Sequence, residues 1–138
     1  GFERTLEVVA SLAVRLDNLG YAVGLVANGT LKGDNSAEIP PSRGPRQVPA
    51  ILEALARIQA RPEGTMTDVI KQFPGSWRGV SCVHFCYQED RSMAEVEKLY
   101  QKRHLPVSFV LGHRKPDSRT TGGPNRFSIE DIRLDRSR

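Results

Sequence analysis

Cysteine, tryptophan and long apolar stretches are scarce in this sequence. Its 138 residues include two cysteines and one tryptophan, and aromatic residues make up 7% of the total. Two cysteines do not make a disulfide scaffold, and Cys82 and Cys86 fall in one apolar segment where a bridge between them is geometrically poor. No apolar run reaches the ~18 residues that a bilayer-spanning helix needs. We therefore expect a globular domain in a reducing, cytoplasmic compartment.

The motifs of common enzyme classes are missing as well. No glycine run stands between a strand and a helix start, as a phosphate-binding loop requires, so nucleotide binding has no support. His104 and His113 have no serine, cysteine or acid beside them in the arrangement of a catalytic nucleophile. Cys82, His84 and Cys86 share one face of an extended strand, but at ~3.3 Å per residue the outer two are roughly 13 Å apart, too far for one zinc ion. The sequence therefore predicts a domain that is not an enzyme, with these three side chains packed in the core.

The sequence does contain an alternation of amphipathic helices and apolar strands. Apolar residues recur at three- and four-residue steps over residues 3–19, and Gly20 ends this predicted helix. The strand that follows at 21–27 is almost wholly apolar, which is typical of parallel sheets covered on both faces. Residues 28–46 are rich in Gly, Pro, Asn and Ser and predict a long surface loop.

The same alternation continues downstream. A helix with Pro49 in its first turn is expected to run until Pro62, and a short helix follows at 66–73. Strands are expected at 80–87 and 106–112, separated by a helix that Ser92 and Glu95 open with a capping box. Residues 127–134 fit a short strand or a helix equally well. The pattern predicts a three-layer α/β fold whose parallel sheet contains the strands near residues 21, 80 and 106.

The two ends of the sequence add to this picture. The first predicted helix starts within a few residues of Gly1, so we expect the first strand of the sheet to precede residue 1. After Gly112, seven Arg or Lys residues stand against four acidic ones, within a formal net charge of +4. We therefore expect a partial α/β domain at 1–112 and a basic, partly flexible segment at 113–138. A basic tail can bind nucleic acid, but this one has almost no aromatic residues for base stacking, so a solvated segment is the simpler interpretation.

The segment Gly64–Asp68 permits two interpretations. The Thr65 hydroxyl is placed to cap the short helix that follows, and Asp68 lies where a negative charge favours the helix dipole. Alternatively, the Thr65 hydroxyl is one oxygen ligand of a hard divalent cation, which also needs carboxylate ligands.

Two longer runs of the sequence resemble a known family. LEVVASLAVRLDNLGYAVGLVANG and IPPSRGPRQVPAILEALARI, over about residues 3–60, resemble the bacterial domain-of-unknown-function family fifty-eight, in its part that is similar to a von Willebrand factor A domain. The resemblance implies a Rossmann-like sheet whose carboxyl edge, in related domains, holds Mg²⁺ through an Asp-x-Ser-x-Ser motif, a threonine and a later aspartate. Thr65 matches the threonine, but this chain has no Asp-x-Ser-x-Ser and carries Cys86, Tyr87 and Gln88 where the later aspartate is expected. We therefore expect no cofactor in these residues, and Mg²⁺ only in a longer protein.

The resemblance also implies a function. Members of the family are commonly encoded beside MoxR-type AAA ATPases, and some carry upstream membrane helices that tether the domain to the inner membrane. We expect a non-enzymatic protein–protein interaction domain that works with a MoxR-type AAA ATPase in assembly or chaperone-like roles. The expected contact surface is the carboxyl edge of the sheet beside the 30–46 loop. Its expected partner-binding residues are Asn28, Thr65, Glu89, Asp90 and His113.

Two alternatives of other classes stay open. One is Mg²⁺-dependent ligand binding by the full-length protein through a metal-ion-dependent adhesion site. The other is nucleic-acid binding by the basic tail, which predicts an affinity that falls steeply with salt.

Overall fold

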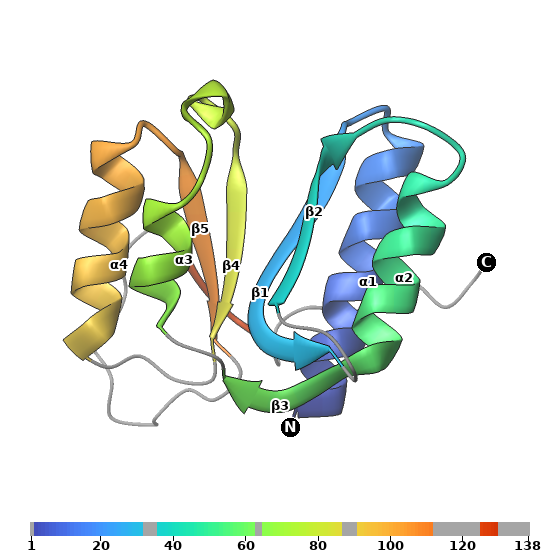
Figure 1. Ribbon diagram of the computed structural model, residues 1–138, viewed down its shortest axis with the longest axis horizontal. Coiled ribbons are helices and arrows are strands. Elements are labelled where there is room, and N and C mark those ends of the chain that lie inside the picture. The colour runs from blue at the N-terminus through green and yellow to red at the C-terminus, as the bar shows by residue number, and fades with distance from the viewer. Residues whose placement is uncertain (1, 32–35, 63–64, 87–90, 112–124, 130–138) are drawn as a thin grey trace. The chain divides into compact units, whose positions relative to one another are not determined.

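The computed structural model describes residues 2–31, 36–62, 65–86, 91–111 and 125–129 (Figure 1). The chain forms two compact units, each with a three-stranded sheet. We call residues 6–66 the N-terminal unit, and residues 67–138 together with residues 1–5 the C-terminal unit.

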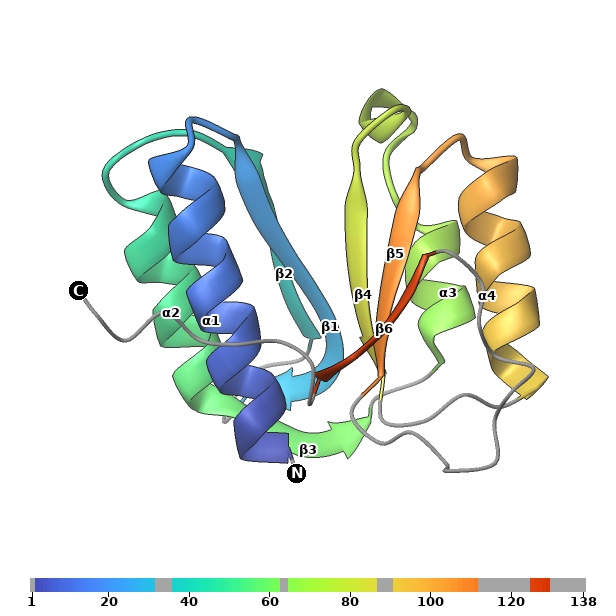
Figure 2. The ribbon, with the colours of Figure 1, turned by 180° about the vertical axis from the view of Figure 1, so that it is seen from behind.

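The N-terminal unit is built on an antiparallel sheet with strand order β2-β1-β3. Its elements in chain order are α1 (Phe2–Asn18), β1 (Val23–Leu31), β2 (Ser36–Ser42), α2 (Gln47–Arg57) and β3 (Ile58–Pro62). Figures 1 and 2 show α1 and α2 side by side along the β1–β2 pair. Apolar side chains from both helices and the pair form its core: Ala13, Val23, Ile51 and Leu55, with Leu6, Val9, Ala10, Leu16, Leu25 and Ile39 packed around them.

The β1–β2 pair is held unusually close near its open end. A side chain at Gly24 would place its Cβ 2.5 Å from the Ile39 carbonyl oxygen, so only glycine fits this position. Pro40 and Pro41 of β2 have no backbone N–H to offer β1. The side chain of Gln47, at the start of α2, compensates by donating to the carbonyl oxygens of Val23 at 2.6 Å and of Pro40 at 2.8 Å.

Three expectations for the N-terminal unit are wrong. The segment 28–46 is not a long loop, because β1 extends to Leu31 and β2 pairs with it from Ser36 to Ser42. The second helix ends at Arg57 rather than Pro62, since Ile58 takes an extended conformation and opens β3. The apolar strand near residue 21 belongs to the antiparallel sheet, not to one parallel sheet with the strands near 80 and 106. Apolar composition predicts burial, but it does not select the direction of the pairing partner.

The C-terminal unit contains a parallel sheet with strand order β4-β5-β6. Its elements in chain order are α3 (Met66–Lys71), the 3-10 turn η1 (Gly75–Trp77), β4 (Cys82–Cys86), α4 (Arg91–Lys102), β5 (Val107–Leu111) and β6 (Arg126–Ser128). Both views show α3 and α4 on the same side of β4 and β5. The side chains of Tyr100, Leu105, Phe109 and Leu111 are buried in this unit.

This architecture confirms the coarse prediction of a mixed α/β protein that has a three-stranded parallel sheet flanked by helices, which is compatible with a Rossmann-like fold. The helices expected from apolar periodicity at 3–19, in the second position and after residue 91 are all present. The ambiguous segment at 127–134 contributes a strand, β6, and its remainder from residue 130 lies outside the described residues. No helix in the described part of the chain is both long enough and apolar enough to cross a bilayer.

Candidate functional site

The five predicted partner-binding residues are distributed unevenly in the structure. Asn28 lies within β1, not after it, because the strand continues to Leu31. Thr65 lies directly before α3 and is exposed. Both belong to the N-terminal unit. Glu89, Asp90 and His113 lie outside the described residues. The grouping of these five side chains on one edge therefore stays a prediction.

The parallel sheet of the C-terminal unit has one face that packs on helices. The pairing register places Cys82, His84 and Cys86 of β4 on the same face as Phe109 of β5. The His84 ring lies 5.4 Å from the Phe109 ring and 5.7 Å from the Tyr100 ring of α4, between ring centroids. A hydrogen bond of 2.7 Å joins His84 Nδ1 and Tyr100 Oη. This face is consequently a packed polar–aromatic cluster, and His84 is only 8% exposed.

Burial controls the ionisation of this cluster. It lowers the pKa of His84 to about 4 and raises the pKa of the Cys82 thiol to about 11. The pKa of Tyr100 is raised first by burial, and then by the nearby Cys82 and Cys86 thiols. At neutral pH the side chains of Cys82, His84 and Tyr100 are therefore uncharged. A thiol with a raised pKa is a poor nucleophile, so Cys82 is poorly suited to nucleophilic attack.

Metal binding was a second interpretation of these residue types. Within the described ranges, no three His, Cys, Asp or Glu side chains come together in a way that could hold a metal ion. The His84 ring instead uses its Nδ1 on Tyr100. Thr65 has an interaction partner of its own, and it belongs to no group of metal-ligating side chains among the described residues.

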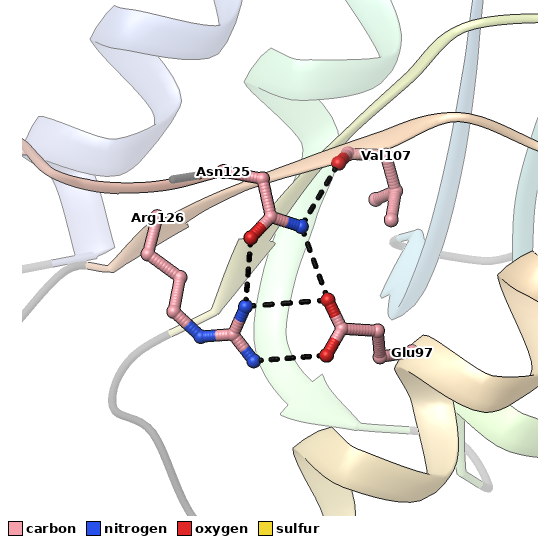
Figure 3. A network of polar contacts seen from close by, with 4 residues as sticks. All are labelled: Glu97, Val107, Asn125 and Arg126. Atoms are coloured by element: carbon pink, nitrogen blue, oxygen red, sulfur yellow. Dashed lines mark hydrogen bonds and ion pairs between the residues drawn. The ribbon is translucent and has the colours of Figure 1, made fainter. Parts of the chain in front are cut away.

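A polar network ties β6 to α4, and sequence reasoning did not anticipate it (Figure 3). The Arg126 guanidinium donates from Nη1 and Nη2 to the two carboxylate oxygens of Glu97, both at 3.2 Å. The side-chain amide of Asn125 donates to Glu97 at 3.0 Å and to the Val107 carbonyl oxygen at 3.2 Å. Arg126 also lies over the Phe109 ring, 5.0 Å from its centroid.

The hydrogen bonds from Arg126, followed by that from Asn125, lower the pKa of Glu97. Glu97 lies 28 residues from Asn125 and 29 residues from Arg126, and residues so far apart form no local sequence pattern that predicts their pairing.

The other face of the parallel sheet carries exposed apolar side chains. We call Val83, Phe85, Val110 and Phe127 the apolar sheet face, since the register and the alternation of each strand place them opposite the helices. Val110 at its centre is buried, but Val83 is 42% exposed and Phe127 is 48% exposed. The apolar strands that became β4 and β5 were expected from the sequence, whereas residues 127–134 fitted a strand or a helix.

Comparison of the chain with protein-family models, with curated proteins and with solved structures gave no match. The assignment of a function consequently depends on the chain's own residues and on the resemblance described above.

Proposed function

We propose that this chain is a non-enzymatic protein-binding domain, and that the apolar sheet face is part of its contact surface. The observation that carries the proposal is the exposure of Val83 and Phe127 on a parallel sheet. Parallel sheets are normally covered on both faces, and large apolar side chains that reach the surface together mark sites of protein contact.

The family resemblance supplies the finer part of the proposal. It favours a von Willebrand factor A-like architecture and a MoxR-type AAA ATPase as the partner, in assembly or chaperone-like work. Aromatic side chains dominate the energetics of protein interfaces, so we expect Phe127 to contribute more than Val83.

The test is a binding measurement between the purified chain and a MoxR-type AAA ATPase. We expect Phe127→Gln to weaken Kd about tenfold, which corresponds to ~1.4 kcal/mol, and Val83→Thr to weaken it less. Leu19→Gln is the matched control, because Leu19 is an apolar residue of the N-terminal unit with 62% exposure. Circular dichroism checks that each variant is folded.

Unchanged binding by both sheet-face variants would overturn the proposal for this surface. Loss of binding on alanine substitution at Thr65, Glu89 and Asp90, with no effect at Phe127, would move the contact to the carboxyl edge predicted from the sequence.

A further inference from the structure

A hollow lies at the amino edge of the parallel sheet, opposite the edge that the sequence pointed to. It has a volume of about 220 Å³ and is lined by Phe73, Pro74, Gly75, Arg78, Arg103 and Leu105, which we call the amino-edge hollow. These residues come from the segments that lead into β4 and β5, and parallel strands bring both segments to one edge. All of them belong to the C-terminal unit.

The walls of the amino-edge hollow are fixed by hydrogen bonds. Arg103 Nη1 donates to the Phe73 carbonyl oxygen at 2.5 Å, and Nη2 donates to that of Lys71, which satisfies carbonyls at the end of α3. The two lining segments are also joined by the Gly79 N–H, which donates to the His104 carbonyl oxygen at 2.8 Å. The hollow is therefore largely formed before any ligand arrives, which reduces the entropic cost of binding.

The lining of the hollow combines apolar side chains with an exposed arginine, Arg78. Phe73 and Leu105 are buried and present the apolar part. Arg78 is exposed, and its side chain makes no hydrogen bond or ion pair with the residues that the structure describes. Lys71 and Lys102, in the last turns of α3 and α4, add positive charge nearby in the sequence. A guanidinium beside an apolar cavity matches a carboxylate next to an apolar group.

We propose that the amino-edge hollow binds an acidic peptide segment of a partner protein, with one apolar side chain inserted in the hollow and a neighbouring carboxylate paired with Arg78. Its volume lies below the roughly 300–1,000 Å³ of pockets for drug-sized ligands, which suits a single inserted side chain. This contact uses other residues than the apolar sheet face, so either proposal can fail without the other.

A phosphate or a nucleic acid fits the hollow less well. Phosphates are commonly bound at helix N-termini, whereas the segments that form the hollow follow the C-terminal ends of α3 and α4. Arg103 already uses both of its terminal nitrogens on carbonyl oxygens, whereas the Arg78 guanidinium has no partner among the residues that the structure describes.

The test uses the full chain and its own fluorescence. Trp77 is the only tryptophan of the sequence, and its ring centroid lies 4.9 Å from that of Phe73, so a ligand in the hollow changes the emission of Trp77. The probe is an acetylated and amidated peptide with one leucine between glutamates. Two control peptides replace the leucine with glycine, or the glutamates with glutamines. We expect saturable binding of the first peptide, and at least tenfold weaker binding of both controls.

Three variants separate the parts of the proposal. Arg78→Gln removes the exposed charge and should weaken the peptide about tenfold, whereas Arg43→Gln, at an exposed arginine of the N-terminal unit, should leave binding unchanged. Gly75→Leu should abolish binding by filling the hollow. A Cβ at Gly75 meets nothing within 4 Å, so the fold accommodates the new side chain.

The proposal is overturned if millimolar peptide gives no saturable change, if Gly75→Leu binds like the unmodified chain, or if all three peptides bind alike. It is also overturned if inorganic phosphate or a single-stranded oligonucleotide binds more tightly than the peptide and this binding is abolished in Gly75→Leu, because the hollow would then be a site for phosphate.

Discussion

At the scale of single residues, His84 shows how burial converts a titratable side chain into a structural one. Its ring is enclosed by Tyr100 and Phe109 and hydrogen-bonded to the Tyr100 hydroxyl. Because burial lowers the pKa of His84 to about 4, the folded protein keeps this ring neutral under conditions in which an unfolded chain protonates it.

This difference predicts a pH-dependent stability. Between an unfolded pKa of about 6.5 and the folded value, the unfolded state binds the extra proton, so the free energy of unfolding falls as the pH is lowered. We expect a loss of about 2 kcal/mol between pH 7 and pH 5, measured by urea unfolding. His84→Gln keeps a hydrogen-bonding group near Tyr100 and should remove most of this dependence, whereas His104→Gln, at an exposed position, should retain it. An unchanged dependence in His84→Gln would contradict the assignment.

At the scale of secondary-structure elements, α1 and α4 end in the same way with different residues. After α1, the Gly20 N–H donates to the Asp17 carbonyl and the Tyr21 N–H to that of Leu16, with Gly20 at φ +92°. After α4, the His104 N–H donates to Gln101 and the Leu105 N–H to Tyr100, with His104 at φ 57°. Both are Schellman ends, a motif in which the left-handed residue is usually glycine.

The comparison predicts opposite effects at the two ends. His104→Gly should raise the free energy of unfolding by about 0.5–1 kcal/mol, since it relieves the left-handed strain, and Gly20→Ala should lower it by about 1 kcal/mol. Thermal and urea unfolding measure both changes. His104→Ala is the control, because alanine keeps a Cβ in the left-handed conformation. Equal stability of the glycine and alanine variants at position 104 would show that the strain has no energetic consequence.

At the scale of the whole molecule, parts that are distant in the sequence stabilise one another. The Glu97–Arg126 pair joins α4 to β6 across 29 positions, and its side chains are only 25% and 14% exposed, respectively. An ion pair of this kind, reinforced by Asn125, should stabilise more than one on an open helix surface.

We expect Arg126→Met to lower the free energy of unfolding by about 1–3 kcal/mol, because it leaves the Glu97 carboxylate without its main partner. The matched control is Glu53→Gln, which breaks the exposed pair with Arg57 at 3.8 Å and should cost at most about 0.5 kcal/mol.

The depressed pKa of Glu97 adds a second criterion. The contribution of the pair to the free energy of unfolding is complete above the ordinary glutamate pKa, and it disappears as the pH falls through the folded value. A loss in Arg126→Met no larger than in Glu53→Gln would contradict the proposed role.

Much of the fold was predictable from sequence, but the pairing of its strands was not. Apolar periodicity predicted α1, α2 and α4, and the apolar runs predicted β1, β4 and β5. β2 was missed because Pro40 and Pro41 are typical of loops, although prolines are tolerated on an outer strand. β3 was missed because Ile58 continues the helical spacing of α2.

The candidate surfaces were harder to predict for a related reason. The amino-edge hollow and the network around Glu97 are assembled from segments about 30 residues apart, and only the parallel pairing of β4, β5 and β6 brings them together. A Pro-Gly pair at 74–75 predicts a turn, but it carries no information on what that turn faces.

The paired prolines of β2 have a consequence for how copies of the protein meet in solution. Among the described strands, β2 lies at an edge of its sheet. An edge strand with free N–H groups is a template for backbone pairing with another chain. Neighbouring residues of a strand point their N–H groups to opposite sides, so one of the two adjacent prolines removes a donor from that template, while the Gln47 amide occupies the Pro40 carbonyl. The prolines that made β2 look like a loop in the sequence thus also leave its outer edge with one donor fewer for pairing with another chain.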